Sequence, residues 1–229
     1  MRETGITQVL RAPSRPLVVT GFVPFAGDAE NPSRLAAHAL DGTRIDGTPV
    51  IGAELPVRTH DVRDALEEIW RLRPVVLLHL GLSGGRAQIA LERIAVNLLD
   101  FSLPDEAGER IEDGTVVPGG PAAYFSTLPV RRSLHRLRAQ GIPAYLSLSA
   151  GAFLCNQVFY LTQHHLKASG EDTLSGFAHL PYLPSQAAAK GACVSSVSLE
   201  IMVEAARILL TVGLEEVRSA GPTTSGASL

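Results

Sequence analysis

One stretch of the chain predicts much of its architecture: SLSAGAFLCNQ, residues 147–157. The apolar run that leads into it, from Ile142 to Leu148, is typical of a short buried strand. Small residues then turn the chain, and apolar residues recur at helical spacing from Asn156 to Lys167. Cys155 is therefore expected where a strand-to-helix turn meets the first turn of the helix.

The position of Cys155 suits a nucleophile. Free backbone N–H groups and the positive end of the helix dipole favour a thiolate there. A thiolate is the form of the side chain that attacks carbonyl carbon, so the position favours acyl transfer. The alternative is a buried structural cysteine, which is common in intracellular proteins. A partner base is needed to decide between the two.

Strands and helices alternate along the rest of the chain. The most apolar segment, Pro74 to Leu80, is expected to be a central strand that is covered on both faces. The alternation predicts an α/β fold, a single-domain α/β/α sandwich with a twisted, mostly parallel sheet covered by helices on both faces. Functional loops should then gather at the carboxyl ends of the strands. Further strands are expected at 16–20, 50–57 and 176–180, and helices after 31–33 and at 61–72, 122–140 and 194–214.

Two segments have no single interpretation. Residues 89–99 fit a strand with Glu92 on the face of Ala90 and Ile94, or a helix with Glu92 off the apolar stripe. Residues 100–121 are rich in Gly, Pro, Asp and Glu, and so long a loop in a compact domain usually covers something or is disordered. Residues 1–15 are expected to be loose, residues 16–216 to form the domain, and residues 217–229 to be a flexible tail.

Composition argues against several classes of function. The 229 residues carry a formal net charge of −3, whereas nucleic-acid and membrane-surface proteins usually present a basic face. No apolar run approaches the roughly 20 residues that span a bilayer, and the N-terminus lacks a signal-peptide core. Two cysteines, Cys155 and Cys193, cannot make a disulfide framework. We expect a cytoplasmic protein without nucleic-acid or membrane partners, in which Cys193 is a packing residue.

His179 is the candidate base for Cys155. A histidine at the end of an apolar segment is more often a satisfied core residue. Cys and His that converge at one sheet edge, however, form a nucleophile–base pair. Glu92 is the candidate for the group that orients the imidazole, because an unpaired buried carboxylate is costly. The alternative for Glu92 is an exposed ion pair with Arg86 or Arg93.

Residues 81–85, Gly-Leu-Ser-Gly-Gly, also fit the G-x-S-x-G pattern of serine hydrolases. In that alternative Ser83 is the nucleophile, His179 the base and a residue such as Asp113 the acid. No clear helix follows Arg86, as that pattern requires, and a tight glycine turn that lets backbone approach a ligand fits better. Phosphate-loop and zinc-ligand spacings are absent from the sequence, so we expect no metal and no cofactor.

From about residue 17 to residue 214 the chain resembles the pyroglutamyl peptidase I (pyrrolidone-carboxylate peptidase) family of cysteine peptidases. Several separate motifs carry the resemblance in order: TGFVPFAG at 20–27 with NPS at 31–33, GGR at 84–86 with ERIAVN at 92–97, GGPAAY at 119–124 with LP at 128–129, SAGAFLCN at 149–156 and GFAHLPYLPSQ at 176–186. The resemblance implies that Cys155 is the nucleophile, His179 the base and Glu92 the orienting acid. It also implies an α/β/α sandwich, a homotetramer, no metal and small pyroglutamyl peptides as partners.

The implied activity is that of an exopeptidase that removes an N-terminal pyroglutamyl residue through an acyl-enzyme. Phe22 and Phe25 could sandwich the flat, uncharged lactam ring, although two loop aromatics can equally pack against the following helix. Backbone N–H groups from Phe153 through Leu154 to Cys155 could stabilise the oxyanion. A dry pocket without a partner for an ammonium would reject ordinary N-termini.

The sequence departs from the usual pattern of this family at four positions. Leu82 stands where Gln is usual, Ser102 replaces a common Arg, Glu106 replaces Asn, and Gln157 replaces a frequent His. The first two are expected near the active site, where they would affect substrate affinity or rate more than the fold. They leave open a further alternative, a non-catalytic or weakly catalytic binder of small pyroglutamyl-like ligands.

Overall fold

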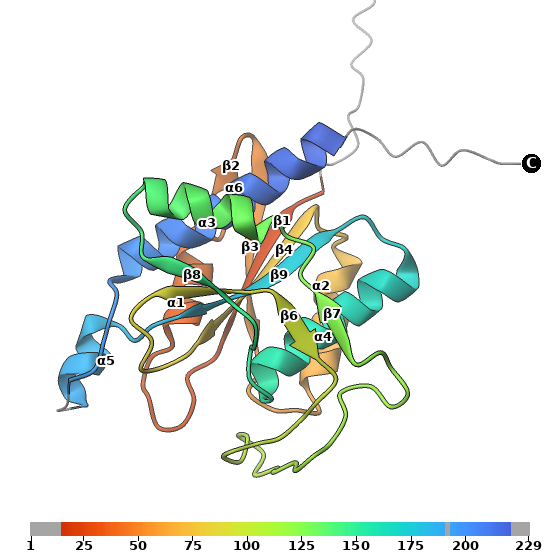
Figure 1. The fold of residues 1–229 in the computed structure, drawn as a ribbon, viewed down its shortest axis with the longest axis vertical. Coiled ribbons are helices and arrows are strands. Elements are labelled where there is room, and N and C mark those ends of the chain that lie inside the picture. Colours follow the sequence, from red (N-terminus) through yellow and green to blue (C-terminus); the bar gives the residue numbers. More distant parts are fainter. Residues whose placement is uncertain (1–14, 191–192, 221–229) are drawn as a thin grey trace, which may run out of the picture.

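The computed structural model describes residues 15–190 and 193–220, which form three layers (Figure 1). The middle layer is a seven-stranded sheet of β1 (Leu17–Phe22), β2 (Arg44–Ile45), β3 (Thr48–Leu55), β4 (Val76–Leu82), β5 (Ile89–Glu92), β8 (Ala144–Ser147) and β9 (Leu174–Leu180). Their order across the sheet is β2-β3-β1-β4-β9-β5-β8. The four strands β3, β1, β4 and β9 run parallel.

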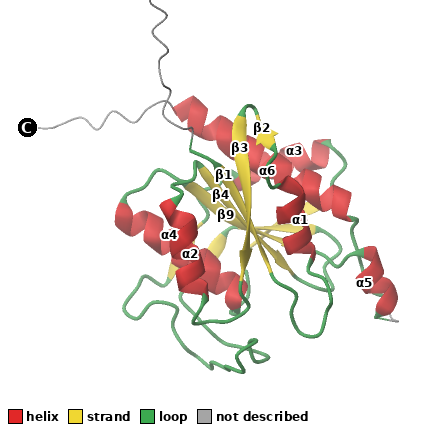
Figure 2. Cartoon of the chain, turned by 180° about the vertical axis from the view of Figure 1, so that it is seen from behind, coloured by secondary structure: helices red, strands yellow, loops and turns green. Residues whose placement is uncertain are grey.

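Helices cover both faces of the sheet, as Figure 2 shows. One face packs against α1 (Pro32–Leu40), α3 (Val130–Ala139) and α6 (Leu199–Ala220), and the other against α2 (Val62–Arg71) and α4 (Leu154–Ser169). A short helix, α5 (Pro184–Ala189), and a two-stranded ribbon of β6 (Ile94–Val96) and β7 (Ala123–Phe125) complete the fold. The predicted α/β/α sandwich is confirmed.

The alternation of side chains along the central strands explains the two cores. On β1, Leu17 and Val19 pack toward α1 and α6, whereas Val18 packs toward α2 and α4. On β4, Leu78 packs in the first of these cores and Leu77 in the second. These two side chains and the three of β1 are almost fully buried. Side chains of a strand point alternately to opposite faces, so a strand that is apolar throughout belongs in the middle of three layers.

Strands β5 and β8 run opposite to the four parallel strands, within a sheet that is mostly parallel as predicted. Strand β5 pairs antiparallel with β9, and β8 pairs parallel with β5, so β8 also runs opposite to β9. The carboxyl ends of β8 and β9 therefore do not meet at one edge of the sheet. The loop from 148 to 153, rather than the end of β8 itself, carries the chain to Cys155 at the start of α4.

The ambiguous segment 89–99 contains two strands, β5 and β6, separated by Arg93. In the antiparallel register with β9, Ala90 lies opposite His179 and Glu92 lies opposite Phe177. Because residues two apart on a strand share a face, Glu92 and His179 are diagonal neighbours on the same face. Glu92 is fully buried, which excludes the exposed ion pair considered for it.

Several expected element boundaries were wrong. The helix predicted at 122–140 begins only at Val130, because residues 123–125 form β7 and Pro129 caps the helix. The last helix covers Leu199–Ala220 instead of 194–214, and so passes the domain boundary expected at 216. Helix α4 begins at Leu154, so Cys155 lies inside its first turn. The loose N-terminal and C-terminal segments that the sequence predicts lie mostly outside the described residues.

The long segment 100–121 is held in place by its own side chains. Asp105, which is 6% exposed, accepts hydrogen bonds from the backbone N–H groups of Thr59 (2.7 Å), Ala107 (2.8 Å) and Glu109 (3.0 Å). Burial works against ionisation of Asp105, but these donors lower the pKa of its carboxyl. A charge-assisted set of bonds at the middle of the segment therefore fixes it against the domain. No helix among the described residues is long and apolar enough to cross a membrane.

Candidate active site

The nucleophile candidate, Cys155, is the second residue of α4, and its sulfur lies against the end of β4. A Cβ atom added to Gly81 would lie 2.9 Å from the Cys155 sulfur, which means that the sulfur packs directly on the Gly81 backbone. Gly81 is the register partner of His179 on the adjacent strand β9. The structure thus brings Cys155 and His179, which are far apart in the sequence, to neighbouring positions over the sheet.

His179 is held by Glu92. The Nδ1 atom of His179 lies 2.8 Å from Oε1 of Glu92, and His179 is only 4% exposed. With the carboxyl ionised, Nδ1 must carry the proton, so Nε2 is left with a free lone pair. Burial lowers the pKa of His179 and outweighs the opposing effect of Glu92. The imidazole is therefore neutral at neutral pH and can accept a proton.

The thiol of Cys155 differs from the sequence prediction of a favoured thiolate. Burial, and then the negative charge of Glu92, raise the pKa of Cys155 to about 12, while Arg86 acts in the opposite direction. The local argument counted the helix N-terminus but not the sheet and side chains that enclose the sulfur. The resting site therefore holds a protonated thiol beside a neutral imidazole, and a base must remove the proton during the reaction.

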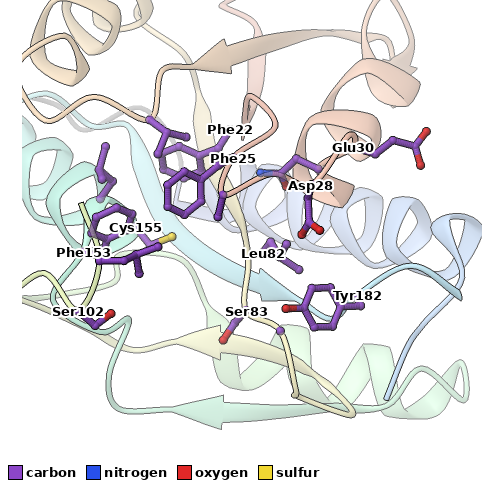
Figure 3. A pocket seen from close by; sticks show the side chains of 16 residues that line it. Phe22, Phe25, Asp28, Glu30, Leu82, Ser83, Ser102, Phe153, Cys155 and Tyr182 are labelled. Carbon is purple, nitrogen blue, oxygen red and sulfur yellow. The ribbon is translucent and has the colours of Figure 1, made fainter. Parts of the chain in front are cut away.

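A cavity of about 520 Å³ opens beside Cys155. Figure 3 shows the sulfur pointing into the space between Phe153 and Leu82. The centroids of the Phe25 and Phe153 rings lie 5.6 Å apart. The rings of Phe101 and Phe153 meet edge to face, with their centroids 4.6 Å apart. All four residues expected to bind substrate line this cavity together with Cys155: Phe22, Phe25, Phe153 and Leu154.

The opposite wall of the cavity is more polar (Figure 3). It includes Ser83, Tyr182, Asp28 and Glu30. Gly84 lies so close to Tyr182 that a Cβ atom there would be 2.2 Å from the ring. The glycine turn after β4 therefore makes room for Tyr182, and not only for a ligand.

The four departures from the family pattern divide into two groups. Leu82 and Ser102 line the cavity, as expected. Gln157 instead forms two hydrogen bonds with Thr59. Its Oε1 accepts from the Thr59 hydroxyl (2.8 Å), and its Nε2 donates to the Thr59 carbonyl (3.0 Å). Glu106 is not among the residues that line this cavity. Only the first two substitutions can therefore act directly on a bound substrate.

The structure gives the serine-hydrolase alternative no support. The Ser83 hydroxyl accepts a hydrogen bond from Nε of Arg86 (2.8 Å), whereas the carboxylate partner of His179 is Glu92 and not Asp113. An arginine cannot act as a general base at neutral pH. Cys193, which was expected to be a packing residue, is exposed.

Sequence reasoning missed the contribution of Arg86 to the site. It regarded Arg86 as a surface partner of Glu92, but the structure places Nη1 of Arg86 3.2 Å from the buried Oε1 atom. The available signal was an arginine directly after Gly84-Gly85, a turn that can direct a long side chain back over the sheet. Within the described ranges, no group of three or more His, Cys, Asp or Glu is arranged to hold a metal ion.

Comparison with known proteins identifies the family of this chain. The family model for pyroglutamyl peptidase matches residues 15–216. The chain belongs to the pyroglutamyl peptidase family. It is 43% identical to the pyrrolidone-carboxylate peptidase of Pyrococcus furiosus over 88% of this chain and 99% of that protein. It is 42% identical to pyrrolidone-carboxylate peptidase 1 of Ralstonia nicotianae over 90% of this chain and 97% of that protein.

A solved structure of a mutant pyrrolidone carboxyl peptidase from Pyrococcus furiosus has the same fold as this family member. The two structures superpose with a TM-score of 0.85 at 43% sequence identity, covering 88% of this chain and 99% of that one. The similarity thus extends over nearly all of the relative and is not limited to the motifs around the cavity.

Proposed function

We propose that Cys155, His179 and Glu92 are the nucleophile, the general base and the orienting acid with which this family member removes N-terminal pyroglutamyl residues from peptides. The observation that supports this most is the 2.8 Å contact between Nδ1 of His179 and Oε1 of Glu92. His179 is paired across the sheet with Gly81, the residue on which the Cys155 sulfur packs. Membership of the pyroglutamyl peptidase family gives the reaction, and the geometry supports the roles of the residues.

In the first half of the reaction, Nε2 of His179 takes the proton of the Cys155 thiol. The thiolate attacks the carbonyl carbon that joins pyroglutamate to the next residue, and a C–S bond forms as the carbonyl oxygen becomes an oxyanion. The carbonyl then re-forms, the C–N bond breaks, and the imidazolium returns its proton to the leaving amine. Glu92 stabilises the imidazolium between these two transfers.

The N-terminus of α4 is suited to the oxyanion. The first hydrogen bond within the helix runs from the Gln157 N–H to the Phe153 carbonyl (3.1 Å), so earlier N–H groups in this turn have no partner inside the helix. Leu154 and Cys155 carry two of them. Donors fixed before the reaction stabilise developing negative charge without reorganisation.

In the second half, water replaces the amine. His179 takes a proton from water, hydroxide attacks the thioester carbonyl, and the C–S bond breaks as the carbonyl re-forms. The imidazolium returns its proton to the Cys155 sulfur, and pyroglutamate and the free thiol are released. The aromatic end of the cavity fits the uncharged lactam ring. An ordinary N-terminus would bring an ammonium among Phe22, Phe25 and Phe153, where it would lose its hydration, because the carboxylates of Asp28 and Glu30 lie on the opposite wall of the cavity.

A fluorogenic assay tests the proposal. Wild-type protein should release aminocoumarin from pyroglutamyl-coumarin but not from alanyl-coumarin, which has a charged amine. Cys155→Ala should abolish turnover, whereas Cys193→Ala, a matched change at an exposed cysteine, should leave it intact. Turnover that survives Cys155→Ala would contradict the proposal. Thermal stabilisation by pyroglutamate without any product would favour the ligand-binder alternative.

We further propose a homotetramer, on the family resemblance alone, and a cytoplasmic location, on composition and the small number of cysteines. One domain, residues 16–220, would carry the whole site. Light scattering coupled to size-exclusion chromatography should give four times the mass of the 24.3 kDa chain. A monomeric mass with full activity would contradict the assembly but leave the chemistry intact.

A further inference from the structure

Glu92 has an unusual environment for a carboxylate. It is fully buried, and its Oε1 atom faces both Nδ1 of His179 (2.8 Å) and Nη1 of Arg86 (3.2 Å). Its other oxygen, Oε2, has no hydrogen-bond partner in the described part of the chain. A buried carboxylate with so few donors lacks most of the compensation that water gives to a charge, so it depends on the few partners that it has.

Arg86 is the cation that compensates this buried carboxylate. Its Nε donates to the Ser83 hydroxyl at 2.8 Å, and its Nη1 donates to the Tyr145 hydroxyl at 2.7 Å. The guanidinium carbon lies 5.9 Å from the centre of the Tyr145 ring. Three partners thus fix the side chain, and a guanidinium keeps its charge at every relevant pH. Arg86 does not line the cavity itself.

We propose that Arg86 is a positioning residue whose fixed charge compensates the buried Glu92 carboxylate and holds it directed at His179, so that the imidazole presents Nε2 to the Cys155 thiol. This inference rests on the proposed function. It assigns to Arg86 an effect on catalysis through Glu92, without contact with substrate. The sequence suggested an exposed ion pair between Glu92 and Arg86, and the structure shows this pair with its carboxylate buried.

The charges around the thiol give the expected direction of the effect. The groups concerned are Glu92 on β5, His179 on β9 and Arg86 in the loop before β5. Glu92 raises the pKa of Cys155 and Arg86 lowers it. Removal of the Arg86 charge alone should leave a thiol that is harder to deprotonate, beside a carboxylate that has lost one of its two partners.

Arg86→Met tests the inference, with Arg93→Met as the matched control. Arg93 is the residue next to Glu92, but it lines a separate groove beside Phe125. We expect Arg86→Met to lower kcat for pyroglutamyl-coumarin on the order of 10- to 100-fold, the range found when the partner that orients a ligating histidine is lost. KM should change little, because Arg86 lies outside the cavity. Arg93→Met should behave as wild type.

The alkylation rate of Cys155 provides a readout that a purely structural role would not move. Iodoacetamide is used in a Cys193→Ala background, so that a single thiol reacts. The pH profile of alkylation should shift to higher pH in Arg86→Met. Arg86→Lys should bring the pH profile of alkylation part of the way back to that of wild type, because it keeps the charge. It should not restore full kcat, because a single ammonium cannot make all the contacts of the planar guanidinium.

The inference would be overturned if Arg86→Met had the unfolding transition, the alkylation profile and the kcat of the wild-type protein. If Arg86→Met does not fold, Arg86→Lys and Tyr145→Phe, which removes one anchor of the guanidinium, replace it. Profiles and kcat values identical to wild type in both would equally overturn it, and reduced kcat with a shifted profile would support it. Wild-type protein that never cleaves pyroglutamyl-coumarin refutes the proposed function instead, and the alkylation profile still tests Arg86.

Discussion

Two buried histidines on neighbouring strands differ in the partners of their rings, and this difference separates the base proposed for the reaction from a histidine with a structural role. His79 on β4 and His179 on β9 lie on either side of Phe177, with ring centroids 6.3 Å and 4.8 Å from it. His79 is fully buried and His179 is 4% exposed. Their partners differ: His79 contacts the hydroxyls of Thr20 (2.8 Å) and Thr162 (3.0 Å), whereas His179 contacts a carboxylate.

The partner, and not the degree of burial, decides what each ring can do. Burial lowers the pKa of His79 to about 3, and its two hydroxyl partners carry no charge that could offset this. Burial also lowers the pKa of His179, but Glu92 counteracts the effect. His79 therefore stays neutral at working pH, whereas His179 can carry a proton for the short life of an intermediate.

The largest expected effect separates the two rings directly. His179→Gln should lower kcat about 10⁶-fold, as loss of the histidine does in other nucleophile–base pairs. His79→Gln should lower the free energy of unfolding but leave kcat of the folded protein near wild type. Steady-state kinetics on both variants, after circular dichroism has shown that each is folded, checks this. Comparable losses of kcat would mean that the distinction between the histidines is wrong.

Glu92→Gln should lower kcat about 10⁴-fold, the size of the loss when the orienting acid of a triad becomes an amide. Glu92 raises the pKa of His179, so its removal lets burial lower that pKa further. The acid limb of kcat/KM should consequently move to lower pH in the variant. A pH–rate profile of the residual activity measures the shift. Movement to higher pH would contradict the assigned charge of Glu92.

His79 should make the protein sensitive to acid. Its pKa is about 3 in the folded protein against an ordinary 6.5, so the folded state binds fewer protons than the unfolded state between these values. The free energy of unfolding should then decrease as pH falls below 6.5, by about 1.4 kcal/mol for each pH unit. Urea unfolding at several pH values measures this slope. His79→Gln should reduce the slope but not abolish it, because His179 also has a lowered pKa, and an unchanged slope would refute the explanation.

The smallest expected effect concerns one partner of His79. Thr162→Val keeps the shape of the side chain but removes the hydroxyl that faces Nε2, leaving a buried polar atom without a partner. We expect the free energy of unfolding to fall by about 1–3 kcal/mol with no change in kcat. Thermal unfolding and the coumarin assay check the two parts. A lowered kcat would show that the two histidines are coupled through Phe177.

The sequence predicted the layers of the fold well because they depend on local patterns. Apolar strands such as Pro74 to Leu80 and the strand–turn–helix around Cys155 are visible without any long-range information. The directions of β5 and β8 were not predictable in this way, because pairing with β9 joins segments far apart in the chain. Residues 89–99 were ambiguous because Arg93 interrupts the strand period.

The site was predictable in its residue types but not in its electrostatics. The roles proposed for Cys155, His179 and Glu92 follow from motif and spacing, and their contacts required the structure. The pKa of Cys155 moved opposite to the expectation because local reasoning sees the helix N-terminus but not the enclosing sheet. Arg86 was undervalued for the same reason, since its partners Ser83 and Tyr145 come together only in the fold.

Gly81 bears on how other members of the family should be judged. A methyl group on this residue would lie 2.9 Å from the Cys155 sulfur and 2.8 Å from the Phe177 ring, closer than packed atoms approach. Gly81→Ala would thus displace the sulfur while every reacting side chain remained in the sequence. A homologue that has a larger residue at this position can therefore retain Cys, His and Glu at the matching positions and still be inactive. In the proposed mechanism, the glycine near the end of β4 is as necessary as the three larger side chains.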